Sequence, residues 1–158
     1  MLTIIEDSSI DTTAEDIQQI RQQLAEWQQL FSPGEEQYTL NGYEHLFVQD
    51  NELLVFDNFS PENTRFTGFD TYRTTWEQAI NKNFPGFVMY HIYIDRIEIS
   101  GRLAWSALTW WGKVAKDGNI QYTSQHGTHI WYKRDGQWQI VHEHLSGPVK
   151  ENGQESRR

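Results

Sequence analysis

The segment "WQIVHEHLS", Trp138 to Ser146, carries two histidines, His142 and His144, on either side of Glu143. Its alternating pattern predicts a β-strand, in which the two histidines project to one face and the glutamate projects to the other, toward solvent or a partner subunit. A His-x-His pair on one face of a strand is a known zinc geometry, although zinc also needs a third protein ligand. Three interpretations stay open: a metal site, an acid-base group, or imidazoles that hydrogen-bond the backbone and fix the strand.

Asp57 and His129 are the side chains that would complete either kind of chemical site. Asp57 ends the strand-like run "ELLVFD", where it is either a pocket base or a turn-forming residue, and His129 lies in "HGTHIWY". A neutral imidazole beside an aspartate suits proton transfer near pH 7. His126 is three residues before His129, which places the two on opposite faces of a strand, so we do not expect them to share a metal.

Helices in the first half and strands in the second half must position these residues. The pattern predicts a helix from the capping box "TTAE" to Phe31, a short helix over 40–47 and a helix that begins at Asp70. Alternating runs follow, separated by "SGR", "KDGN" and "RDGQ", and Asp-Gly pairs between such runs are strong hairpin signals. The four predicted strands are Phe87–Ile99, Leu103–Ala115, Ile120–Lys133 and Gln137–Ser146. Helices followed by an antiparallel meander indicate an α+β fold.

Both faces of the predicted sheet are apolar. Leu103, Trp105, Ala107 and Trp111 project to one side, and Ala104, Leu108 and Trp110 project to the other. Three helices can cover only one side, so we expect a second copy to cover the other and the protein to be a homodimer. The alternative is a sheet that coils on itself and buries its own aromatic side chains.

The composition indicates one domain and narrows the classes of partner. The 158 residues suffice for one core, and we expect an extension over 1–11, a domain over 12–148 and a disordered tail over 149–158. A net charge of -9 disfavours nucleic acid and membrane surfaces as partners. The absence of cysteine excludes disulfides, zinc-thiolate sites and thiol nucleophiles. Without an apolar run of about 20 residues or a basic start, a cytoplasmic location is expected.

Three stretches resemble the nuclear transport factor 2-like superfamily. The ending "THIWYKRDGQWQIVHEHLSGP" is similar to the closing hairpin of SnoaL-like proteins and of the calcium/calmodulin-dependent kinase II association domain. "VFDNFSPENTRFTGFDTYRTTWEQ" is similar to the family's first strand, loop and third helix, and "ISGRLAWSALTWW" is similar to its central strand. The resemblance implies a cystatin-like cone, with N-terminal helices packed in a strongly curved antiparallel sheet around a pocket.

The resemblance also implies site residues. Asp57 matches the catalytic carboxylate of the ketosteroid isomerase-like branch, which removes a proton next to a carbonyl. His129 matches that branch's buried acid and a pocket arginine of the association domain, and a histidine there can donate a hydrogen bond to an oxyanion. His144 is expected near the pocket floor as a third catalytic residue. The lining is expected to comprise Trp27, Tyr43, Trp76, Trp105, Trp131 and His142, with no metal and no cofactor.

Two departures from these relatives limit what the resemblance implies. Trp27 stands where the isomerases place an oxyanion-hole tyrosine, and Ala107 stands where the association domain has its other pocket arginine. Steroid isomerisation is therefore not expected. The leading prediction is a SnoaL-like domain that binds a small hydrophobic molecule in an enclosed aromatic-lined pocket, as a cofactor-independent acid-base isomerase, cyclase or dehydratase. The alternative is a non-catalytic homo-oligomerisation module, and a metal-dependent enzyme ranks third.

Overall fold

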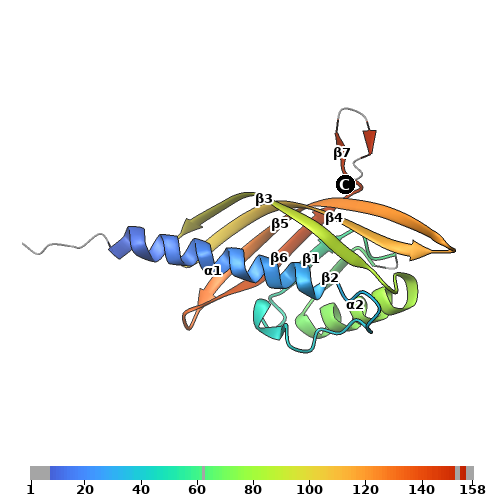
Figure 1. Cartoon of the computed structure of the whole chain (residues 1–158). Coiled ribbons are helices and arrows are strands. Elements are labelled where there is room, and N and C mark those ends of the chain that lie inside the picture. Colours follow the sequence, from blue (N-terminus) through green and yellow to red (C-terminus); the bar gives the residue numbers. More distant parts are fainter. Residues whose placement is uncertain (1–7, 62, 152–153, 156–158) are drawn as a thin grey trace, which may run out of the picture.

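The computed structural model describes residues 8–61, 63–151 and 154–155 (Figure 1). Helices pack against one face of a curved six-stranded sheet, whose strand order is β2 (Arg65–Thr67), β1 (Leu54–Asp57), β6 (Gln137–Ser146), β5 (Asn119–Arg134), β4 (Leu103–Lys116) and β3 (Val88–Ser100). This arrangement confirms the α+β prediction. The sheet is mixed rather than antiparallel, because β1 runs parallel to β6.

The helices are α1 (Ser8–Leu30), the 3-10 turn η1 (Glu44–Leu46) and α2 (Phe69–Asn83). The predicted first and third helices are confirmed, but α1 begins before the "TTAE" box, so that box does not cap it. The described part of the predicted extension, 8–11, belongs to this helix, and residues 1–7 lie outside the described chain. The predicted helix over 40–47 is wrong, since only the single turn η1 forms there.

Six strands form the main sheet: β1 (Leu54–Asp57), β2 (Arg65–Thr67), β3 (Val88–Ser100), β4 (Leu103–Lys116), β5 (Asn119–Arg134) and β6 (Gln137–Ser146). The four long strands match the predicted runs to within one or two residues. Asp117 and Asp135 have positive φ angles of 53° and 51°, and the glycines that follow them also have positive φ. Two consecutive positive φ angles are what a tight hairpin turn requires, so the Asp-Gly signals were correct.

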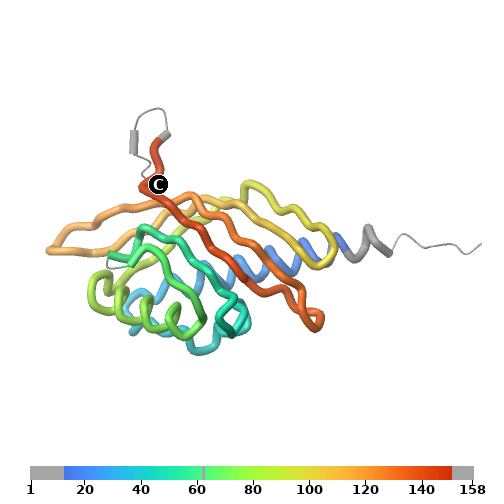
Figure 2. Tube along the Cα trace, turned by 180° about the vertical axis from the view of Figure 1, so that it is seen from behind, coloured from blue at the N-terminus to red at the C-terminus, as the bar shows by residue number. Residues whose placement is uncertain are grey.

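The strand β1 enters the sheet beside the last long strand, β6, far away in the sequence (Figure 2). Its register places Leu54 opposite His142 and Asp57 opposite Leu145. The sequence did not predict this parallel pair or β2, whose three residues lie in the expected loop "NFSPENTRFTG". Such short segments show too little alternation to be distinguished from a loop.

Helix α1 lies across the inner face of the sheet, where Ile20, Leu24 and Trp27 are buried. Its polar side chains also reach the sheet. Asp16 accepts hydrogen bonds from Lys133 Nζ at 2.9 Å and Trp138 Nε1 at 3.0 Å. Helix α2 covers that face at one end, near β1 and β2 (Figures 1 and 2).

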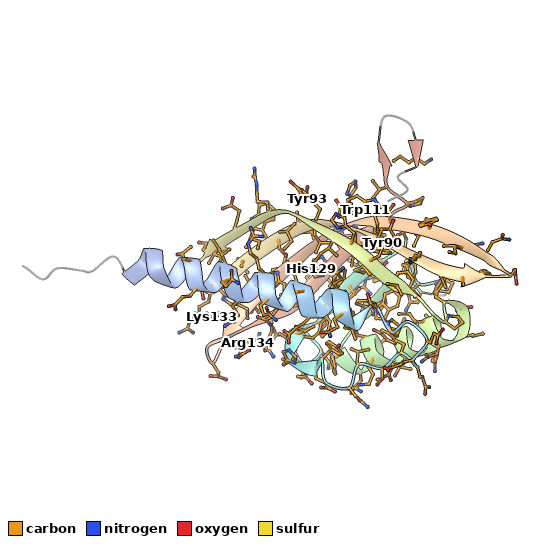
Figure 3. All side chains as sticks on the ribbon, in the orientation of Figure 1. Tyr90, Tyr93, Trp111, His129, Lys133 and Arg134 are labelled. Atoms are coloured by element: carbon orange, nitrogen blue, oxygen red, sulfur yellow. The ribbon has the colours of Figure 1, made fainter. Side chains whose placement is uncertain are left out.

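The outer face of the sheet mixes polar side chains with apolar ones, several of which are exposed in the single chain. All the exposed large hydrophobic side chains in the described ranges share this face, as the strand pairings show: Tyr93, Leu103, Trp105, Ile120 and Tyr122. Figure 3 shows Tyr93 on the side of the sheet away from α1. Trp111 shares this side but is only 3% exposed, with its ring stacked on that of His91.

The segment after β6 differs from the expected disordered tail. Val149 is buried, and its backbone N–H donates to Ser124 Oγ at 3.1 Å. The two short strands β7 (Lys150–Glu151) and β8 (Gln154–Glu155) then pair with each other, and residues 152–153 and 156–158 lie outside the described chain. In the described part of the chain, no helix combines the length and hydrophobicity needed to cross a bilayer.

Candidate active site

Asp57 is a buried carboxyl group at the end of β1, with only 6% of its surface exposed. Its Oδ1 accepts hydrogen bonds from the Phe59 backbone N–H at 2.8 Å and from Gln125 Nε2 at 2.9 Å. Burial, with a smaller contribution from the charge of Glu143, raises the pKa of Asp57 from 3.8 to about 7 against the opposing effect of these two hydrogen bonds. A carboxyl with this pKa exchanges protons readily at neutral pH.

The described residues donate two hydrogen bonds to the Asp57 carboxyl, and both go to Oδ1. Its other oxygen, Oδ2, is therefore the atom that can take or give a proton. The wall beside it is aromatic, and among the residues that the structure describes no lysine or arginine lines the small cavity into which Asp57 projects. The lining comprises Trp27, Phe31, Asp57, Phe59, Trp76, Phe87, Met89, Trp110, Gln125, Glu143 and Leu145.

The free volume of this cavity is only ≈ 20 Å³. A volume of about 10–15 Å³ is needed to hold one water molecule, so the cavity has room for a single small group. Aromatic side chains line this cavity, but they are packed closely together, and the enclosed pocket expected from the sequence stays a prediction. A larger molecule can enter only if a side chain moves, and Phe59, which is half-buried on the loop after β1, lies at the surface end of the lining.

Glu143 is a second carboxylate on the same cavity wall, and it is only 1% exposed. Its Oε1 accepts a hydrogen bond from Trp27 Nε1 at 2.9 Å, and its Oε2 accepts one from the Tyr72 hydroxyl at 3.0 Å. His129 Nε2 lies 3.3 Å from Oε1, close enough for an ion pair when the imidazole is protonated. The burial and the negative charge of Glu143 raise the pKa of Tyr72 well above 10, so its hydroxyl remains a donor.

The prediction that Glu143 faces solvent is wrong, and a bulge explains the error. Trp131 pairs with Ile140, whereas the preceding Ile130 pairs with His142, so Val141 is an extra residue in β6. A β-bulge of this kind shifts the alternation of side chains by one position. As a result Glu143, and not its neighbouring histidines, shares the inner face with Ile140.

His142 and His144 lie on the outer face of the sheet, so their predicted places at the pocket are wrong. His142 is half-buried, its Nδ1 lies 2.7 Å from the carbonyl oxygen of Leu54, and His144 is exposed. Both imidazoles pack edge-on against Phe56, with ring centroids 5.3 Å apart in each pair. For His142 this arrangement agrees with the third interpretation of the histidine pair, in which an imidazole hydrogen-bonds the backbone and fixes the strand.

His129 is fully buried on the inner face, as Figure 3 shows beside α1. Its ring packs edge-on against the Trp27 indole, with centroids 4.9 Å apart. His126 is exposed on the other face, so the expectation that the two histidines point in opposite directions is confirmed. Glu143, which is in contact with His129, lines the same cavity as Asp57.

The remaining predicted lining residues divide into two groups. Trp27 and Trp76 line the cavity as expected. Trp131 is buried but bonds to Ser106 Oγ through its indole N–H, Tyr43 is half-buried beside η1, and Trp105 is 39% exposed on the outer face. These three are not part of the lining. The sequence did not predict Gln125, Tyr72, Phe59 and Trp110 as site residues. The alternation of β4 puts Trp110 on the inner face, and helical spacing puts Tyr72 on the same face of α2 as Trp76.

Metal ligands do not gather in the described part of the chain. No three His, Asp or Glu side chains there lie close enough together to hold a metal ion. The chemistry that the described site can perform with its own groups is proton transfer by Asp57, next to a hydrogen-bonded carboxylate and an imidazole.

The comparisons with known proteins agree with the cystatin-like fold. Residues 20–150 match the profile of the SnoaL-like domain family. Among solved structures, a nuclear transport factor 2-like superfamily protein from Salmonella enterica serovar Typhimurium LT2 superposes with a TM-score of 0.72 at 19% identity, covering 92% of this chain and 99% of that one. No curated protein sequence gives a significant match.

Two further structural relatives represent different functional classes. One is a candidate scytalone dehydratase from Novosphingobium aromaticivorans, with a TM-score of 0.66 at 20% identity and 86% coverage of both chains. The other is the association domain of Caenorhabditis elegans CaMKII, with a TM-score of 0.58 at 18% identity, covering 90% of this chain and all of that one. At such identities the likeness shows the fold alone.

Proposed function

Because the chain belongs to the SnoaL-like domain family, we propose that it binds a small hydrophobic molecule in the inner cavity and catalyses a proton transfer on it. The observation that carries this proposal is Asp57, a buried carboxyl with a pKa of about 7 in an aromatic cavity. Isomerisation, cyclisation and dehydration of a carbonyl compound all begin with such a transfer, and none of them requires a cofactor.

In this proposal Asp57 is the catalytic base, through its Oδ2. Gln125 is a positioning residue, since it holds the carboxyl by Oδ1 and opposes the rise of the pKa. His129 and Glu143 form the second polar group, in which the imidazole can supply a proton next to the carboxylate. His144 has no part in the site, because its side chain lies on the outer face.

The test uses α-proton exchange of 2-tetralone, an aromatic ketone, followed by NMR in deuterated water. We expect the protein to accelerate the exchange, with a rate that rises as the pH passes through about 7 and Asp57 becomes ionised. Asp57→Asn removes the base while keeping an oxygen that can accept both hydrogen bonds, and we expect it to lose the acceleration by a factor of about 100 or more.

The matched control is Asp70→Asn, which replaces an exposed carboxylate in the first turn of α2. This variant should exchange 2-tetralone at the wild-type rate. Equal rates for wild type and the Asp57 variant would remove Asp57 from the mechanism.

A second function, homo-oligomerisation, is supported by the outer face of the sheet. All five exposed large hydrophobic side chains within the described ranges lie on this face, across β3, β4 and β5. Apolar groups gathered in this way favour contact with another protein surface. We infer that two copies pack these faces together in a homodimer. The dimer is compatible with catalysis, because the cavity opens on the opposite side of the sheet.

A further inference from the structure

We propose that the indole N–H groups of Trp76 and Trp110 bind the oxygen of a flat, ring-containing ketone, whose ring takes the place of the Phe59 side chain. This inference deepens the proposed function, on whose cavity it rests, by naming the class of molecule that the cavity accepts. It also assigns a binding role to two tryptophans on different elements, α2 and β4.

Two buried donors without acceptors carry the inference. The Nε1 atoms of Trp76 and Trp110 are shielded from solvent and have no hydrogen-bond partner among the described residues. By contrast, the indoles of Trp27, Trp131 and Trp138 each donate to a buried acceptor. A buried N–H without an acceptor is unfavourable, so such groups are normally satisfied by protein, water or ligand. Both orphaned indoles belong to side chains that line the cavity beside Asp57.

Phe59 indicates the shape of the bound molecule. Its ring contacts both tryptophans, with centroids 6.2 Å from Trp76 and 5.7 Å from Trp110. Phe84 and Phe87 complete the surroundings at 4.6 Å and 5.4 Å. An aromatic ring therefore already fits this space. Because Phe59 is half-buried on a loop, its side chain can move outward and leave the space to another flat ring.

The polar groups of the cavity select a neutral oxygen acceptor. Asp57 and Glu143 both line it, and no lysine or arginine of the described ranges does, so an anionic ligand is repelled. A cation would be attracted to the carboxylates but would leave both indole N–H groups without an acceptor. A ketone oxygen accepts two hydrogen bonds, and its α-carbon is the atom from which a base such as Asp57 removes a proton.

The experiment follows the indole N–H resonances of ¹⁵N-tryptophan-labelled protein during titration with 2-tetralone. Replacement of individual tryptophans by phenylalanine assigns the resonances of the seven tryptophans. We expect 2-tetralone to shift the Trp76 and Trp110 resonances downfield and to leave that of Trp105, on the outer face, unchanged. Trp76→Phe and Trp110→Phe should each weaken binding about 3- to 10-fold, as expected for one hydrogen bond. Trp105→Phe is the matched control and should bind 2-tetralone as the wild type does.

Tetralin, which has the same rings without the oxygen, separates hydrogen bonding from packing. Its binding should be equally strong in the wild type and in the two cavity variants. Equal losses for tetralin and 2-tetralone would overturn the inference, as would unchanged Trp76 and Trp110 resonances, which would mean that water alone satisfies these donors.

Phe59→Ala provides a test that leaves both indoles in place. It should strengthen binding of 2-tetralone, because the ring of the ketone no longer has to displace a side chain, and unchanged or weaker binding would contradict the placement of the ring. The outcome is separable from that of the proposed function. If 2-tetralone binds with the expected shifts but its α-protons do not exchange, only the proposed catalysis is wrong. If the exchange is unaffected by Trp76→Phe and Trp110→Phe, only this inference is wrong.

Discussion

Two buried carboxyl groups on one cavity wall differ in their hydrogen-bond donors. Glu143 receives donors on both oxygens, from Trp27 and Tyr72, whereas Asp57 receives both of its donors on one oxygen. Burial favours the neutral form of a carboxyl that is not fully hydrogen-bonded. The pKa of about 7 that burial gives Asp57 suits this carboxyl to change its protonation state near neutral pH.

The raised pKa of Asp57 should appear in the pH dependence of stability. Between pH 3.8 and about 7 the folded protein holds a proton on Asp57 that the unfolded chain has lost. Stability from this group is therefore complete below pH 3.8 and falls as the pH rises toward 7. Asp57→Asn abolishes that loss. The free energy of unfolding of the variant minus that of the wild type should therefore rise by about 2–3 kcal/mol between about pH 5 and about pH 8. Each pKa unit contributes ~1.4 kcal/mol to this rise.

Urea unfolding of both proteins at the two pH values measures this difference. Asp70→Asn, which replaces an exposed carboxylate, should show a difference from wild type that does not change with pH. A pH-independent difference for Asp57→Asn as well would mean that Asp57 is ionised in the folded protein at pH 5.

At the scale of elements, Glu143 joins the strand β6 to both helices. Trp27 reaches it from α1 and Tyr72 reaches it from α2, across 116 and 71 positions of sequence. These bonds lie beside the cavity, so the spacing of α1 and α2 over the sheet also sets the position of the cavity wall. The polar cluster therefore has a structural role that is independent of catalysis.

Removal of one donor tests that structural role. Tyr72→Phe should lower the free energy of unfolding by about 1.5–3 kcal/mol, because a buried carboxylate loses a hydrogen bond. Tyr93→Phe, which removes a hydroxyl from a side chain that is 59% exposed, should change it by less than about 0.5 kcal/mol. Chemical denaturation compares the two variants, and equal effects would show that the bond to Glu143 contributes nothing to stability.

At the scale of the whole molecule, the sheet separates the face on which we propose catalysis from the face on which we propose association. The inner face holds the carboxyl groups and the cavity, and the outer face exposes aromatic and aliphatic side chains.

The outer face predicts how oligomeric state responds to charge. Leu103→Glu and Tyr122→Glu each place an acidic group on this face, and burial of an unpaired charge between two copies is costly. Native mass spectrometry should record a dimer for the wild type and a monomer for both variants at the same concentration. Gln22→Glu, on the exposed side of α1, should remain dimeric. A monomeric wild type, or variants that stay dimeric, would contradict the inferred interface.

The sequence was informative wherever its local pattern was strong. Alternation and Asp-Gly turns predicted the four long strands, and helical spacing predicted α1 and α2. The family resemblance placed Asp57 at the end of β1. The weak signals failed, since η1, β2 and the parallel pairing of β1 with β6 depend on contacts with distant parts of the chain.

What only the tertiary structure decided was the side of the sheet on which each polar residue of β6 lies. Within "VHEH" the alternation correctly separated Glu143 from the two histidines, but alternation alone does not say which face is inside. The extra residue at Val141 reverses the phase after Ile140, so the glutamate enters the core and the histidines leave it. A bulge exists only in the pairing of two strands, β5 and β6. The residues capable of chemistry could thus be recognised from the sequence, whereas their assembly into one site depended on that pairing.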